Sequence, residues 1–167
     1  MRKVWMVLYN LFFKQFPESI SGTGVGARLR RFAVQRFIKE CGKKPSIGVG
    51  ARIHKNTIIG DFSGIGRNCE LMNGVIIGNH VMMGPDCYIC TENHEFSDTS
   101  VPMRMQGMRE RESVTIEDDC WIGARVIILP GVVIGRGSVI GAGAVVAKSI
   151  PPFSVAVGNP ARIVKTR

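Results

Sequence analysis

An aliphatic residue or methionine recurs at every sixth position over much of this chain. The first series keeps one phase over its eight members: Ile47, Ile53, Ile59, Ile65, Leu71, Ile77, Met83 and Ile89. Glycine follows five of these residues, at Gly48, Gly60, Gly66, Gly78 and Gly84. The fifth slot of each unit is small or short-branched from Ala51 to Cys87 and becomes polar at Asn93.

The series stops after His94 and resumes in a new phase. Its second run consists of Ile116, Ile122, Ile128, Ile134, Ile140 and Val146. A period of six matches neither the 3.6 of an α-helix nor the 2 of an ordinary strand. It is typical of a solenoid, in which each short strand turns a corner and stacks on the coil below. We therefore expect an all-β solenoid with the aliphatic residues inside, where glycine permits backbone geometry that a Cβ would oppose.

Residues 1–45 lie outside the repeat, and we expect them to form a short helical N-terminal segment. Residues 46–167 are expected to form the solenoid, and the two parts to make one structural unit. Val4–Phe13 is apolar but too short to span a bilayer, and no small-residue cleavage site follows it. One helical face carries apolar side chains, at Val4, Leu8, Leu11 and Phe12. A second helix is expected over residues 27–40, with its arginines on the polar face. We expect the first helix to pack on the solenoid or on a neighbouring subunit, with peripheral membrane contact as the alternative.

The net charge of +9 raises the question of a nucleic-acid partner. The basic residues cluster at 28–36, at 104–111 and at the C-terminus, without interleaved aromatic residues or a nucleic-acid-binding motif. An anionic small ligand, a glycan or a membrane surface explains the charge equally well. We expect no nucleic-acid partner.

Metal binding is also not expected. Cys87 and Cys90 form a CxxC pair, but Cys87 takes the small fifth slot of its unit, and a second pair of ligands is missing. The histidines His54, His80 and His94 are too widely spaced to resemble paired zinc ligands. The cysteines are expected to pack as free thiols in a reducing compartment.

His94 is the leading catalytic candidate. His54 and His80 lie inside regular hexads, whereas His94 ends the first run and opens a 21-residue insertion, 95–115. A loop that leaves a solenoid lies on its surface, which is a usual place for function. An imidazole with a pKa of ~6.5 can take a proton near neutral pH. The alternative is a solvated histidine at a corner.

Residues 91–96, followed by Pro102-Met103 and Gln106-Gly107, resemble the histidine loop of the hexapeptide-repeat O-acetyltransferases. The resemblance continues through residues 116–124, 128–135, 139–143 and 158–162, and so covers about 41–167. It implies a left-handed parallel β-helix with three hexads per coil, or about 2.7 coils over residues 47–94 and two more over 116–151. Gly26, Leu29-Arg30 and Cys41-Gly42 are similar to the branch found with capsular and exopolysaccharide synthesis.

The resemblance also implies roles for single residues. His94 would act as the general base, and the backbone N–H of Ala124 would stabilise the oxyanion. Acetyl coenzyme A would be bound by Trp121, Ala124, Ala142, Lys148 and Arg162. The candidates for contact with the acceptor are Asn73, Arg104 and Gln106, with Arg109 as a further basic side chain of the insertion. No serine or cysteine forms a nucleophile arrangement with His94, so direct transfer in a ternary complex is expected.

Together these patterns predict a cytoplasmic O-acetyltransferase that acts on a sugar hydroxyl of a surface polysaccharide or its precursor. If the membrane alternative holds, the enzyme would work at the inner face of the membrane. The resemblance implies a homotrimer, and apolar residues expected outside the core, Val75, Ile76 and Val133, are compatible with it. The alternatives are acetylation of a small xenobiotic or an amino sugar and, in another class, a non-catalytic β-helix scaffold subunit.

Overall fold

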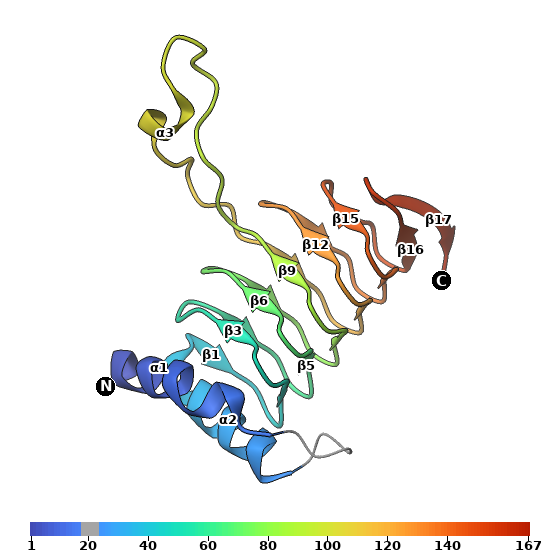
Figure 1. Cartoon of the computed structure of the whole chain (residues 1–167). Coiled ribbons are helices and arrows are strands. Elements are labelled where there is room, and N and C mark those ends of the chain that lie inside the picture. The colour runs from blue at the N-terminus through green and yellow to red at the C-terminus, as the bar shows by residue number, and fades with distance from the viewer. Residues whose placement is uncertain (18–23) are drawn as a thin grey trace.

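The computed structural model describes residues 1–17 and 24–167 and has the form of a left-handed parallel β-helix with helices at one end (Figure 1). Residues 18–23, part of the segment expected to be helical over 1–45, lie outside the described residues. The solenoid has three parallel sheets, which we call A, B and C. The predicted fold class is confirmed.

Each coil contributes one short strand to each sheet. Sheet A contains β1 (Glu40–Cys41), β4 (Ile58–Ile59), β7 (Ile76–Ile77), β10 (Thr115–Ile116) and β13 (Val133–Ile134). Sheet B contains β2 (Ser46–Ile47), β5 (Gly64–Ile65), β8 (Met82–Met83), β11 (Trp121–Ile122), β14 (Val139–Ile140), β16 (Ser154–Val157) and the antiparallel β17 (Arg162–Thr166). Sheet C contains β3 (Arg52–Ile53), β6 (Glu70–Leu71), β9 (Tyr88–Ile89), β12 (Ile127–Ile128) and β15 (Val145–Val146).

The stack is taller than the hexad pattern indicates. At the lower end β1 pairs with β4, although it precedes Ile47, where the hexad series starts. At the upper end β16 pairs with β14, beyond the last hexad residue, Val146. These strands pair through backbone groups, which do not require the aliphatic-glycine signature. The pattern therefore underestimates the number of coils.

The insertion does not disturb the register of the coils on either side. Ile116 pairs with Ile77 in sheet A, and Ile128 pairs with Ile89 in sheet C. The first-slot residues from Ile47 to Val146 are buried in one core, as expected. Val75 is also fully buried, so its predicted place outside the core is wrong, because the fifth slot points inward at the corner. Ile76 is partly exposed, and Val133 is 38% exposed.

Two helices cover the lower end of the solenoid. They are α1 (Arg2–Leu11) and α2 (Val25–Phe37), with a short 3₁₀ helix, η1 (Phe13–Gln15), after α1. Tyr9 of α1 is fully buried and donates a hydrogen bond to the carbonyl of Ala51 (2.7 Å). Sheet edges that end in solvent expose unpaired backbone groups, and helices at this end protect them. Within the described residues, no helix has the length and apolar character needed to cross a membrane.

Candidate active site

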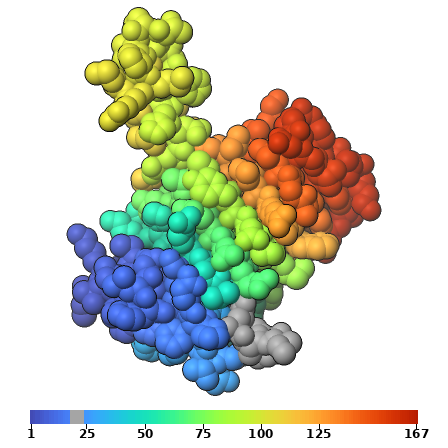
Figure 2. Space-filling model, in the orientation of Figure 1, coloured from blue at the N-terminus to red at the C-terminus, as the bar shows by residue number. Residues whose placement is uncertain are grey.

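The insertion forms an arm that extends far from the solenoid (Figures 1 and 2). We define the arm as residues 91–112. Its base is a two-stranded ribbon, held by backbone hydrogen bonds from Glu95 to Gly107 (3.1 Å), from Arg109 to Asn93 (2.9 Å) and from Glu112 to Thr91 (3.0 Å). The arm leaves at the corner between sheets C and A, after β9 and before β10. A short helix, α3 (Met103–Gln106), lies near its tip.

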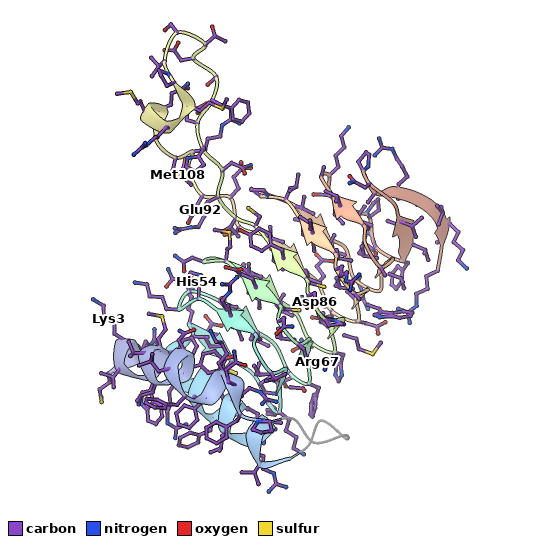
Figure 3. All side chains as sticks on the ribbon, viewed as in Figure 1. Lys3, His54, Arg67, Asp86, Glu92 and Met108 are labelled. Atoms are coloured by element: carbon purple, nitrogen blue, oxygen red, sulfur yellow. The ribbon has the colours of Figure 1, made fainter. Side chains whose placement is uncertain are left out.

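His94 lies on this ribbon, paired with Met108 across it. Its side chain is exposed, and within the described residues its imidazole makes no hydrogen bond or ion pair. Figure 3 labels Glu92 and Met108 on the arm beside it. A histidine in this setting is held by the backbone while its ring nitrogens stay free to meet a substrate.

The neighbouring Glu95 is fixed as an anion. Its carboxylate accepts hydrogen bonds from the side chain and backbone of Ser97, the backbone of Phe96 and the guanidinium of Arg109 (3.2 Å). The bonds from Ser97 are the main reason that the pKa of Glu95 falls to about 2. Arg109 also lies 4.3 Å from the centre of the Phe96 ring. This network shapes the arm beside His94 and occupies Arg109, which the sequence had suggested as a sugar contact.

A first group of predicted site residues shares the corner between sheets C and A with the arm. Asn73 lies one coil below, where its carbonyl accepts a hydrogen bond from the Thr91 hydroxyl (2.9 Å). The side-chain oxygen of Asn73 accepts a bond from the backbone of Asn56 (3.3 Å). Lys148 is exposed on the top coil at the same corner, after β15. One corner therefore carries His94, Asn73 and Lys148.

A second group lies at the corner between sheets B and C. Ala124 and Ala142 belong to adjacent coils there, and the amide of Gly143 donates to the carbonyl of Ala124 (2.8 Å). Arg162, exposed on β17, follows Ala161, whose amide bonds to Val145 at the upper end of sheet C (2.8 Å). Within the described chain neither Ala124 nor Ala142 uses its own N–H in a hydrogen bond. The same is true of Arg67 in a lower coil, so a free N–H is a regular feature of this corner.

Trp121 lies on the outer surface of sheet B and is 53% exposed. It lines a hollow of about 540 Å³, whose other lining residues are Met82, Asp119, Val139, Val155, Lys165, Thr166 and Arg167. Arg167 closes one side by an ion pair with Asp119 (2.9 Å). Met82 and Val139 were not predicted as site residues, but the repeat marks them, because Met82, Trp121 and Val139 hold equivalent positions on successive coils.

The two remaining acceptor candidates lie at the tip of the arm. Gln106 donates to the carbonyls of Asp98 (2.7 Å) and Val101 (2.6 Å) and accepts from the amide of Asp98 (3.1 Å). Its amide group is thus engaged in holding the tip together. Arg104 on α3 is exposed and forms no ion pair within the described residues.

The cysteines are free thiols, and most are buried. A hydrogen bond that Cys69 donates to Cys87, together with burial, raises the pKa of Cys69, and burial raises that of Cys120. Burial likewise raises the pKa of Cys41 to about 11. Thiols held protonated in this way are poor nucleophiles at neutral pH. In the part of the chain that the structure describes, no three histidine, cysteine or acidic residues are grouped to hold a metal ion.

The proteins that this chain is similar to, in sequence and in structure, are mostly acetyltransferases built from hexapeptide repeats. The family described as Bacterial transferase hexapeptide (six repeats) matches residues 50–85 and 113–148. The structure of a maltose O-acetyltransferase from Clostridium difficile 630 superposes with a TM-score of 0.81 at 32% identity, covering 99% of this chain and 85% of that one. A hexapeptide-repeat acetyltransferase from Vibrio cholerae, solved with acetyl coenzyme A, gives a TM-score of 0.77 at 27% identity and covers 99% and 84%.

Curated sequences extend the comparison. The proposed colanic acid biosynthesis acetyltransferase WcaF of Escherichia coli (strain K12) is 29% identical over 169 residues, which cover 99% of this chain and 86% of WcaF. The chain spans about half the length, from 39% to 56%, of the four curated relatives whose matches are shorter but of higher identity.

Proposed function

We propose that this chain, which belongs to the hexapeptide-repeat acyltransferase family, moves an acetyl group from acetyl coenzyme A to a sugar hydroxyl. The observation that carries the proposal is the arm: it interrupts an otherwise regular solenoid at one corner and presents the exposed, unengaged imidazole of His94. The relatives support the donor, since the Vibrio cholerae structure contains acetyl coenzyme A. They also support the acceptor, since the relatives' names include maltose and colanic acid biosynthesis.

In this proposal His94 is the general base. The imidazole takes the proton of the acceptor hydroxyl as its oxygen attacks the thioester carbonyl. The resulting tetrahedral oxyanion accepts a hydrogen bond from the backbone N–H of Ala124, which has no other acceptor within the described chain. The carbon–sulfur bond then breaks, and the imidazolium returns the proton to the departing thiolate. A direct transfer is favoured because the cysteines Cys69, Cys87 and Cys120 are buried in the core of the solenoid, where they cannot reach a substrate.

The donor would lie along the corner between sheets B and C. The small side chain of Ala142 leaves room for the donor along this edge. The free N–H of Ala142 can donate a hydrogen bond to an amide carbonyl of the pantetheine arm. The Trp121 ring offers an apolar surface beside the thioester. The exposed cation Arg162 of this corner, and Lys148 from the corner of His94 on a neighbouring subunit, would pair with the phosphates of the nucleotide end.

The enzyme would work as a homotrimer with its sites between subunits. In one chain, sheet C separates the corner of His94 from the corner of Ala124, and the arm points away from the solenoid (Figure 1). If His94 and Ala124 serve one reaction, the arm must reach the corner between sheets B and C of a neighbouring subunit. The acceptor would then lie between Asn73 at the foot of the arm and Arg104 at its tip, while Gln106 shapes the tip.

The test is release of free coenzyme A thiol from acetyl coenzyme A with a panel of sugars, amino sugars and small alcohols. His94→Ala should lower kcat by ~10²–10⁴-fold, because general-base catalysis contributes about that much. The affinity for acetyl coenzyme A should be retained, as His94 is not among the proposed donor contacts. Turnover with a sugar, and not with an amino sugar or small alcohol, would identify the acceptor class.

His54→Ala is the matched control, since His54 is also exposed but belongs to a regular hexad (Figure 3). It should leave turnover unchanged. A wild-type chain that does not bind acetyl coenzyme A would refute the enzyme proposal and favour the scaffold alternative. Equal activity of His94→Ala and wild type would refute His94 as the base.

A further inference from the structure

The helical end of the molecule has a surface that the acetyl-transfer proposal does not use. Helix α1 is apolar on two opposite sides. Tyr9 and the partly buried Trp5 and Met6 face the rest of the protein. On the other side Val4, Val7 and Leu11 are 60%, 51% and 67% exposed. We call these three residues the outer stripe of α1.

The outer stripe is continuous along the helix. Residues spaced by three and four positions lie above one another on one helical face, so the side chains of Val4, Val7 and Leu11 form a single ridge. Phe12, 60% exposed, and Phe16, 37% exposed, extend the apolar surface beyond the end of α1. A ridge of this kind is costly to leave in water, and none of the described residues covers it.

The segments that form the helical end carry charge of one sign. Residues 1–17 and 24–39 include Arg2, Lys3, Lys14, Arg28, Arg30, Arg31, Arg36 and Lys39 and no acidic residue. Glu18 is the one acidic residue that precedes Glu40 in the sequence. Lys3 extends from α1 away from the solenoid (Figure 3). Apart from the buried Arg30, these basic residues form no ion pair within the described part of the chain.

We propose that the outer stripe of α1 and the basic residues around it form a docking surface for an anionic lipid membrane. A helix that lies in a membrane interface combines an exposed apolar stripe with cationic flanks. Anionic headgroups attract each nearby lysine or arginine. A nucleic acid would be attracted by the same charges, but its phosphate backbone offers no apolar surface on which Val4, Val7 and Leu11 could be buried. Another subunit could cover the stripe, but it would carry the same positive charge, so the basic residues of the two copies would not attract each other.

One exposed cation of α2, Arg36, is held where α1 and α2 meet. The guanidinium carbon of Arg36 lies 3.2 Å from the centre of the Phe32 ring and 5.1 Å from the centre of the Trp5 ring, where α1 and α2 meet. Phe32 itself is 42% exposed. Arg36 is therefore held at the boundary between the two helices, beside Trp5 and not on the outer stripe itself.

The experiment is co-flotation of the full-length chain with lipid vesicles. The chain should float with vesicles of phosphatidylcholine and phosphatidylglycerol in equal parts, should not float with pure phosphatidylcholine, and should be released by added salt. The double substitution Val7→Ser and Leu11→Ser should weaken binding to the mixed vesicles by about tenfold or more, because two aliphatic side chains no longer leave water. This readout is independent of the acetyl-transfer proposal, because it uses neither donor nor acceptor.

Val164→Ser is the matched control. Val164 is 58% exposed on β17, at the opposite end of the solenoid, and its loss should not alter flotation. Circular dichroism and the mass in solution should be unchanged in all three proteins. The proposal is overturned if the wild type does not bind the mixed vesicles, or if the stripe variant binds them equally well. It is also overturned if that variant changes the number of subunits, or if the chain binds single-stranded RNA and not vesicles.

Discussion

At the scale of single residues, the glycines of the repeat are needed for a reason that the sequence does not reveal. None of the glycines that follow the aliphatic residues of the first run has a positive φ, and several corner residues with a positive φ are not glycine, among them Phe62, Asn68 and His80. The glycines that follow the aliphatic residues are required because the next coil passes too close. A Cβ on Gly66 would lie 2.1 Å from the backbone oxygen of Gly84. Close stacking, rather than a special backbone conformation, explains these glycines.

This explanation gives a prediction. Gly66→Ala should destabilise the fold by about 3 kcal/mol, because the coils must separate to admit the methyl group. Gly64→Ala is the control, since a Cβ there would meet no atom closer than 3.9 Å. The measurement is the free energy of unfolding in urea. Similar losses for the two variants would mean that glycine in this sheet matters for a reason other than coil contact.

At the scale of elements, α2 joins the solenoid through a buried arginine. Arg30 was expected on the polar face of its helix, but its side chain is fully buried, so that expectation is wrong. It donates hydrogen bonds to the carbonyls of Ile47 (2.7 Å) and Phe16 (2.5 Å). The Ile47 carbonyl lies on β2, the first strand of sheet B, which has no coil beneath it. Arg30 thus supplies the hydrogen bond that another coil would provide.

Replacing Arg30 tests this role. Arg30→Met keeps much of the volume but leaves two carbonyls without their donor, and should cost about 3 kcal/mol in the free energy of unfolding. Arg28→Met, an exposed position on the same helix, should change it by less than about 0.5 kcal/mol. Thermal or urea unfolding followed by far-ultraviolet circular dichroism measures both. If Arg30→Met is as stable as wild type, the arginine does not anchor the end of the solenoid.

At the scale of the whole molecule, the proposed site residues fall into two separate groups. His94, Asn73 and Lys148 share one corner, and Ala124, Ala142 and Arg162 share another. An arm that points away from its own solenoid is suited to complete a site on a neighbouring copy (Figure 2). Under the proposed trimer, each site would use His94 of one subunit and Arg162 of the next.

Mixing two impaired chains tests this arrangement. His94→Ala and Arg162→Glu should each have low activity at subsaturating acetyl coenzyme A. When the two chains are refolded together in equal amounts, about a quarter of the wild-type activity should return, because random closed trimers combine intact halves of the site. A mixture that stays as inactive as its parts would mean that each site lies within one chain. The mass of each refolded protein by light scattering serves as the control for assembly.

The sequence by itself determined the solenoid and the place, after His94, where an insertion interrupts it. A repeated pattern is decisive here because each coil contacts mainly its two neighbours, so local spacing sets the packing. Val75 and Arg30 were misplaced because their burial depends on contacts from the next coil or from another element. Tertiary structure alone decided which site residues share a corner, how the Glu95 network shapes the arm, and that α1 keeps an outer apolar stripe. These properties depend on distances between segments far apart in the chain, which no periodicity records.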